Sequence, residues 1–373
     1  MLMVPTPHDA EIHPLAPYAM HGGDTAGRVH PEPRHAYRNP YQRDRDRIVH
    51  SSAFRRLAHK TQVFTGTMGD YHRSRLTHTL EVASIARTVG RTLRLNEDLI
   101  EALALAHDIG HPPFGHAGED VLDECLADHG GFNHNRQALR IVELLETRYP
   151  EFPGLNLSRE VLVGQQARTE KSAAGEGPPG RLLEAQVVDA ADSIAYDAHD
   201  ADDAVELGLL DVEDLQGAAL WRTAAARARR RYAVLDAHQF RRAAVHEVIG
   251  MLVSDLIAAS TERLAAAAPQ SADDVRQCAA PLAAPSPEMA PQKLELERLL
   301  FEHVYRHPTV LEQRSVAGRA LREMFERTVA DPQRLPEQFA AVAQRDGLPR
   351  AVADYLACMT DRFALEEHRR LRR

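Results

Sequence analysis

The sequence has few aromatic residues, few cysteines, no surplus of basic charge and no long apolar run. Aromatic residues make up 5% of its 373 residues, while Ala, Leu, Glu and Arg dominate long stretches. This composition favours helices over sheets, which are enriched in β-branched and aromatic residues. Because 44% of the residues are hydrophobic, the chain can bury a sizeable core. We therefore predict a globular all-α protein.

The three cysteines, Cys125, Cys278 and Cys358, lie far apart and form no Cys-x-x-Cys pair. This pattern indicates neither a disulfide framework nor a thiolate zinc site, and it favours a reducing, cytoplasmic location. No run of about 18 apolar residues occurs, and polar residues stand where a signal peptide would have its apolar segment. We expect neither export nor membrane insertion.

The formal net charge of -9 argues against a dedicated nucleic-acid-binding protein, which usually carries a basic surplus or a basic stripe. Local basic pockets remain compatible with this charge. Weak binding of single-stranded nucleic acid is therefore kept open as a partner interaction.

The chain divides by composition into four parts. Residues 1–36 are rich in Pro, His and Gly and are expected to form an extended N-terminal arm. Residues 37–265 carry helical periodicity and form the main domain, residues 266–292 are an Ala/Pro-rich linker, and residues 293–373 form a C-terminal helical segment. Within the main domain we predict helices at 39–64, 73–95, 99–107, 117–127, 135–147, 181–205 and 241–268. Asn96 is the expected N-cap of the third.

Four polar residues stand in apolar helical surroundings. His107 and Asp108 end the segment LIEALALAHD, and burying an ionised Asp without a partner costs several kcal/mol, so a bound cation is expected. His78, in RSRLTHTLEVA, and Asp192, in EAQVVDAADSIAY, are the candidates for further ligands because each lies in another apolar helix. Imidazole and carboxylate ligands suit Mn²⁺, Fe²⁺, Co²⁺, Ni²⁺ or Zn²⁺, whereas Mg²⁺ prefers an all-oxygen shell. We expect a divalent metal ion, with Mn²⁺ first among these.

Five ordered blocks carry a resemblance to a known family. The order His, His-Asp, Asp and the text HDIGHPPFGH resemble the HD phosphohydrolase superfamily. The blocks SSAFRRLAHKTQVF, RSRLTHTLEVASIAR, AHDIGHPPFGHAGE, FNHNRQALR and DSIAYDAHDADDA are similar to its dGTPase-like branch, the deoxynucleoside triphosphate triphosphohydrolases, and above all to the smaller bacterial type. A weaker match lies at residues 301–310. The resemblance implies an HD-domain helical bundle with additional C-terminal helices.

The resemblance also assigns roles to individual residues. It implies four metal ligands, which are His78, His107, Asp108 and Asp192. It makes His116 and Glu119 the catalytic pair, and their spacing of three residues at a helix start places both on one face. The implied reaction is attack of a metal-activated water on the α-phosphorus of a dNTP, which releases a deoxynucleoside and triphosphate.

Substrate contacts follow from the same comparison. Gln62 and Val63 match positions that meet the deoxyribose, and Tyr196 and Asp200 match positions near the sugar 3′ end. Arg75 and His134 are the best candidates for the triphosphate, which needs converging cations. His111 has three open roles, namely a second metal site, support of the His116 loop or packing, and we favour the last two. The resemblance further implies a homo-oligomer.

Two alternatives remain at this point. An HD-type 5′-nucleotidase or cyclic-nucleotide phosphodiesterase would share the metal site but release other products. A catalytically silent nucleotide sensor or single-strand nucleic-acid binder would have lost metal ligands or gained a basic groove. The presence of all four ligands and of the His116/Glu119 pair favours the triphosphohydrolase.

Overall fold

The polypeptide folds as a bundle of helices in the computed structural model, which describes residues 14–62, 73–170 and 180–372. In these ranges the only strand-type pairings are two isolated bridges, Arg28 with Ser158 and Thr61 with Ser74. The predicted all-α class is therefore confirmed.

The α-helices have the following bounds: α2 Pro40–Val49, α3 Ser52–Arg56, α4 Arg75–Thr92, α5 Glu97–Ala106, α6 Gly115–Cys125, α7 His134–Arg140, α8 Arg159–Thr169, α9 Leu183–Glu206, α10 Ala219–Arg231, α11 Ala237–Ala267, α12 Ala272–Gln277, α13 Met289–Leu300, α14 Pro308–Ala330, α15 Ala340–Asp346, α16 Leu348–Ala357 and α17 Asp361–Leu371. Single π-helical turns at Ile141–Leu145 and Phe301–Tyr305 follow α7 and α13.

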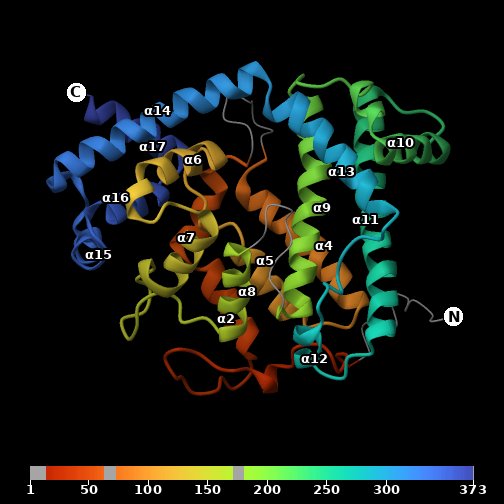
Figure 1. The fold of residues 1–373 in the computed structure, drawn as a ribbon, viewed down its shortest axis with the longest axis horizontal. Coiled ribbons are helices and arrows are strands. Elements are labelled where there is room, and N and C mark those ends of the chain that lie inside the picture. Colours follow the sequence, from red (N-terminus) through yellow and green to blue (C-terminus); the bar gives the residue numbers. More distant parts are fainter. Residues whose placement is uncertain (1–13, 63–72, 171–179, 373) are drawn as a thin grey trace.

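Helices α4, α5 and α9 form the centre of the main core (Figure 1). The Asn96 side chain accepts a hydrogen bond from the Leu99 amide at the start of α5, which confirms the predicted N-cap. Helix α4 approaches α5 closely at Gly90, where a Cβ atom would lie only 2.1 Å from Ile100 Cδ1. This close packing fixes the relative position of the two helices that carry His78 and His107.

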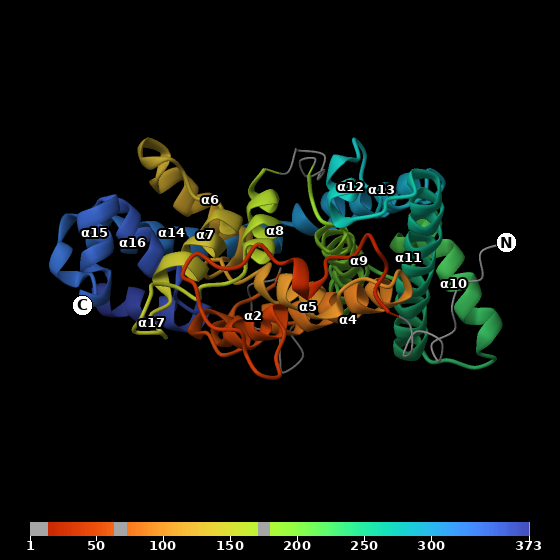
Figure 2. The same cartoon turned by 90° about the horizontal axis from the view of Figure 1, so that it is seen from below.

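A second hydrophobic cluster joins α6 to the C-terminal helices. Leu122 and Leu126 of the α6 region pack with Leu321 of α14 and Leu356 of α16. Figure 1 shows α14 running from α13 across to α6 and α16, and Figure 2 shows α15, α16 and α17 at one end of the elongated molecule, with α10 and α11 at the other. The C-terminal segment thus packs directly on the helix that begins at Gly115.

The segment 266–292 is partly helical, because it contains α12. Its residues Val275, Leu282 and Ala283 are buried in the main core. The division of the chain at this segment stays a prediction.

Helix α11 is, within the described ranges, the one helix long and apolar enough to cross a membrane by length and composition. It packs against α4, α9 and α10, and Val248, Leu252 and Leu256 contribute to the main core. A core helix of a folded domain has the same composition.

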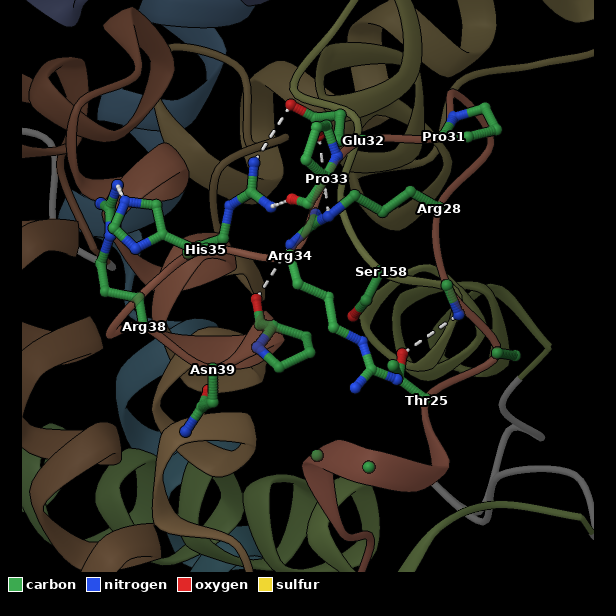
Figure 3. Close-up of a pocket in the computed structure, with 16 residues that line it drawn as sticks. Thr25, Arg28, Pro31, Glu32, Pro33, Arg34, His35, Arg38, Asn39 and Ser158 are labelled. Atoms are coloured by element: carbon green, nitrogen blue, oxygen red, sulfur yellow. Dashed lines mark hydrogen bonds and ion pairs between the residues drawn. The ribbon is translucent and has the colours of Figure 1, made fainter.

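Residues 14–39 contain one short 3₁₀ turn, Gly22–Asp24, and contact both α8, where Glu160 accepts from Thr25 and the Ala26 amide, and α2, where Arg43 donates to Glu32. Arg28 anchors them, because its guanidinium donates to Asp44 and to the carbonyl oxygens of Pro40 and Asn156. A cavity of about 680 Å³ lies beside this contact, and Arg34 extends across it toward Thr25 (Figure 3). None of the predicted site residues lines this cavity.

Candidate active site

Three of the four predicted metal ligands come together from three helices. His78 of α4, His107 at the end of α5 and Asp192 of α9 offer ligand atoms that all lie within 4.8 Å of one another. Asp192 Oδ1 is 3.1 Å from His78 Nε2 and 3.6 Å from His107 Nε2. Imidazole nitrogens and a carboxylate oxygen form a donor set that suits a borderline divalent cation.

The imidazole of His107 has a fixed orientation. Its Nδ1 donates a hydrogen bond of 2.6 Å to the Ala104 carbonyl oxygen, so the lone pair is left on Nε2. Nε2 is buried and has no hydrogen-bond partner among the described residues. Buried polar atoms are rarely left unsatisfied, and backbone support of the far nitrogen is typical of metal-binding histidines. The residues present therefore fit a divalent metal ion.

Asp108 lies next to this group and is shared with other partners. Its Oδ1 is 3.3 Å from His107 Nε2 and 3.0 Å from His111 Nδ1, and its Oδ2 accepts from Arg75 Nη1 at 2.9 Å. Burial alone would raise the pKa of Asp108, but its contacts with His111, His107 and the Arg75 guanidinium hold it well below the ordinary value. Asp108 is therefore an ionised carboxylate.

Arg168, which the sequence did not single out, holds Asp192 from the opposite side. This residue of α8 donates from Nη2 to Asp192 Oδ2 at 2.6 Å and from Nη1 to Asp189. Asp192 Oδ1 remains directed at the two imidazoles. Burial would raise the pKa of Asp192, but His107, His78 and Arg168 keep it well below the ordinary value.

The pKa values of the two imidazoles are shifted in opposite directions. Burial lowers the pKa of His107, so this ring is neutral, as a metal ligand must be. Burial opposes protonation of His78 as well, but its hydrogen bond to Asp192 raises its pKa.

His116 and Glu119 stand at the start of α6, beside His111 and His134. Glu119 Oε2 lies 3.4 Å from His116 Nδ1, but its Oε1 lies only 2.8 Å from His134 Nδ1 and accepts from the His134 amide at 2.9 Å. The His134 ring stacks on His111 at 3.8 Å. Burial alone would raise the pKa of Glu119, but hydrogen bonds to His116 and His134 lower it strongly. Glu119 is therefore an ionised carboxylate between two imidazoles, and its closer partner is His134.

The His116 side chain is 45% exposed, whereas His111 is 4% exposed. His116 is consequently the member of this group that solvent or a substrate can reach. His111 fills the space between Asp108 and His134.

A third group lies further along α9. The hydroxyl of Tyr305 donates to Asp200, and the ring of Tyr305 stacks on Tyr196 at 5.9 Å. Burial raises the pKa of Asp200 to about 7, although the hydrogen bond from Tyr305 counteracts it. Tyr305 is a residue that sequence reasoning missed. Its only signal was the weak block LFEHVYRHPTV.

Arg75 and Gln62 are buried rather than open to solvent. Arg75 is 1% exposed, and its Nη2 donates to the Gln62 carbonyl oxygen at 3.1 Å, so its guanidinium links Gln62 to Asp108. The Gln62 Oε1 atom is buried and has no hydrogen-bond partner within the described ranges. Val63 lies outside the described residues.

Comparison with known proteins places this arrangement in a class. Residues 75–197 match the HD domain, and residues 283–370 match the phosphohydrolase-associated domain. The helical fold and the His/Asp group thus define a hydrolase of the HD class. The first match contains His78, His107, Asp108 and Asp192.

Close relatives span nearly the whole chain. The deoxyguanosinetriphosphate triphosphohydrolase-like protein of Ralstonia nicotianae is 46% identical over 378 residues, which cover 99% of this chain and 97% of the relative. The proteins of the same name from Thiobacillus denitrificans and Geobacter sulfurreducens are 47% and 44% identical and cover 96% of this chain, with 97% and 94% of the relatives matched. The chain belongs to the family of deoxyguanosinetriphosphate triphosphohydrolase-like proteins.

Proposed function

We propose that this hydrolase cleaves deoxynucleoside triphosphates, dGTP among them, into a deoxynucleoside and triphosphate. The observation that carries the proposal is the convergence of His78, His107 and Asp192 around the unpartnered His107 Nε2. The names of the relatives, which describe them as dGTP triphosphohydrolase-like, support the choice of substrate.

In this proposal His78, His107, Asp108 and Asp192 hold a divalent cation, with Mn²⁺ as the first choice. When bound, such a cation lowers the pKa of a coordinated water and neutralises charge on phosphoryl oxygens. The chain's own residues must then orient the substrate and manage protons.

His116 and Glu119 are proposed as the acid–base pair. The His116 ring is accessible and has a carboxylate 3.4 Å away, so it can donate a proton to the leaving oxygen while Glu119 stabilises the imidazolium. His134 shares that carboxylate and is proposed, with Arg75, to contact the triphosphate. Arg75 is already paired with Asp108. Its proposed contribution is therefore positive charge near the phosphates.

The deoxyribose is proposed to lie against Tyr196 and Asp200, and Gln62 and Val63 are proposed as its further contacts. An aromatic ring packed against the 2′ carbon leaves no room for a ribose hydroxyl. The stacked Tyr305 ring supports Tyr196 in this role and holds Asp200 through its hydroxyl.

The proposal is tested by separating the products formed from each of the four dNTPs with Mn²⁺, Co²⁺ or Mg²⁺. Tripolyphosphate, seen by ³¹P NMR, together with the deoxynucleoside would support it. Orthophosphate from dAMP would instead indicate a 5′-nucleotidase, and cleavage of a cyclic dinucleotide would indicate a phosphodiesterase. Nucleotide binding without turnover would indicate a sensor.

We propose in addition that the enzyme works as a homo-oligomer in the cytoplasm. The cysteines Cys125, Cys278 and Cys358 are free thiols, which is compatible with a reducing compartment. Sedimentation of the purified protein with and without dNTP tests the assembly.

A further inference from the structure

One carboxylate near the end of the chain reaches two segments beside the candidate active site. Asp361, the first residue of α17, accepts a hydrogen bond from the Phe114 amide at 3.0 Å through Oδ1. Its Oδ2 accepts from the Thr61 amide at 2.9 Å and from the Thr61 hydroxyl at 2.5 Å. The two partners are 247 and 300 residues away in the sequence.

The bond to Phe114 falls on an unusual turn. Phe114 has φ 65° and ψ 21°, the left-handed conformation that costs a non-glycine residue about 1–2 kcal/mol, and Gly115 follows with φ 57°. This turn begins α6, so it sets the direction in which His116 and Glu119 project. Phe114 has no side-chain cap to offer α6. The hydrogen bond from its amide to Asp361 is therefore the polar contact that fixes the turn from outside.

The bonds to Thr61 fix a second segment, Thr61–Gln62, which lies against the turn at Gly115. Gln62, the next residue, accepts from Arg75 through its carbonyl oxygen, and Arg75 in turn pairs with Asp108. A Cβ on Gly115 would lie 3.0 Å from Arg75 Nη2 and 3.3 Å from the Gln62 oxygen, so the two segments touch. Asp361 thus joins the Thr61–Gln62 segment to the Phe114–Gly115 turn where the two are in contact.

The carboxylate of Asp361 is not needed for its own helix. Helix α17 is capped by Thr360, whose side chain accepts from the Phe363 amide. A neighbouring contact also joins the C-terminal helices to the segment around His111. The buried Lys60 ammonium donates to the carbonyl oxygens of His111 and Ala357. The end of α16 and the start of α17 therefore contact Lys60, Thr61 and Phe114 through hydrogen bonds that mostly join a side chain to a backbone group.

We propose that Asp361 is a positioning residue of the active site and that the phosphohydrolase-associated segment completes the site through it. Asp361 fixes the position of the Phe114–Gly115 turn relative to the Thr61–Gln62 segment. This position orients His116 toward the substrate and preserves the contact of Arg75 with Asp108. The part of this statement that concerns turnover depends on the function proposed above.

The test compares Asp361→Asn with Asp354→Asn. Asn keeps one accepting oxygen but sets an NH₂ group against an amide donor, so one of the two bridges is lost. Asp354 is the control, since it is a carboxylate of the same segment, buried where Asp361 is half-buried, and it binds Arg140 of α7 rather than the turn. Hydrogen exchange of the peptides around Thr61 and Phe114 is measured together with kcat and KM for dGTP and Mn²⁺.

We expect Asp361→Asn to speed exchange at both peptides and to lower kcat about 10-fold or more, the scale of a misplaced catalytic group, with KM nearly unchanged. Asp354→Asn should lower the melting temperature without either effect. In a His116→Ala background, Asp361→Asn should cost no more than about 2-fold further, because the group it aims is already gone.

Equal exchange in Asp361→Asn and the wild type would overturn the proposal, and so would a fully additive loss in the double variant. If the wild type released no product from any dNTP, the proposed function would fail. The exchange measurement would still decide whether Asp361 holds the turn.

Discussion

At the scale of single residues, substitution of His107 is the most direct test of the proposed metal site. Its Nδ1 is committed to the Ala104 carbonyl oxygen, and its buried Nε2 faces Asp192. Replacing it with Ala removes a ligand without adding a charge. We expect His107→Ala to abolish Mn²⁺ binding in calorimetry and turnover with it, whereas His238→Ala, at an exposed position of α11, should change neither. Metal bound at wild-type affinity would refute the assignment.

Arg168 is a second residue-scale test, because it occupies the Asp192 oxygen that does not face the imidazoles. Outer contacts of this kind typically change metal affinity by about 10–100-fold. We expect Arg168→Met to weaken Mn²⁺ binding within that range, and Arg168→Lys, which keeps the charge but not the two-pronged contact, to fall between. An unchanged dissociation constant in Arg168→Met would restrict Arg168 to joining α8 and α9.

Tyr196 gives a residue-scale test of sugar selection. If its ring excludes the 2′ hydroxyl, Tyr196→Ala should lower the ratio of kcat/KM for dGTP over GTP by about 10-fold or more. Tyr305→Ala is the informative companion, since it removes the stacked support but not the excluding ring. A ratio unaffected by Tyr196→Ala would return that residue to ordinary packing.

At the scale of elements, a buried ion pair joins α13 to α9. Lys293 Nζ lies 2.7 Å from Asp197 Oδ2, and these side chains are 12% and 1% exposed. Burial raises the pKa of Asp197 to about 7, and Lys293 counteracts it. Because this folded pKa lies above the ordinary 3.8, the stability that Asp197 contributes is present at low pH and is lost as pH rises toward 7.

Lys293→Met should raise the pKa of Asp197 further and leave its carboxylate unpaired. We expect a loss of about 3 kcal/mol in the free energy of unfolding at pH 8, the usual scale for a broken buried pair, and a loss of less than about 1 kcal/mol at pH 5. Chemical denaturation across this pH range measures the difference. In the double variant Asp197→Asn/Lys293→Met, the loss of unfolding free energy should be the same at pH 5 and pH 8. A loss that does not depend on pH in Lys293→Met alone would contradict the interpretation.

The helices differ in how well they could be predicted from their sequence. Helices α4, α5 and α9 lie close to the predicted ranges, because they are long and periodic and α5 has a clear cap. The predicted helix 39–64 is instead broken after Val49, where Ser51 caps α3. Helices α8 and α10 were not predicted. Gly164 weakens the helical pattern in the sequence of α8, where it allows close contact with Leu103. Helix α10 buries mostly Ala, whose small side chain gives a weak periodic signal.

The candidate site was predictable where its residues share a block of sequence. His78, His107, Asp108 and Asp192 stand in apolar helical sequence, so each could be inferred by itself; the first three are buried, and the Asp192 side chain is 22% exposed. Arg168, Tyr305 and Asp361 could not be found in that way. Each is an ordinary polar residue of its own helix, and only tertiary packing brings it to the site.

At the scale of the whole molecule, the second hydrophobic cluster packs the C-terminal helices on α6, so we expect them to unfold together. Leu321 of α14 is fully buried against α6. We expect Leu321→Ala to lower the free energy of unfolding by about 2–5 kcal/mol, as cavity-forming substitutions do, and to move a single calorimetric transition as a whole. Val316→Ala, at an exposed position of the same helix, is the control. Two separate transitions would show instead that the C-terminal segment unfolds independently.

The position of Asp361 in the chain has a consequence for biosynthesis. Translation proceeds from the N-terminus, so Thr61 and Phe114 leave the ribosome long before the residue that bonds to both of them. Until the codon for Asp361 has been read, the nascent protein can assemble the helices around His107 but lacks the acceptor for the Phe114 amide in the turn ahead of His116. On the function proposed above, products that end before Asp361 should therefore turn over more slowly than the whole chain, even when their N-terminal helices have already folded.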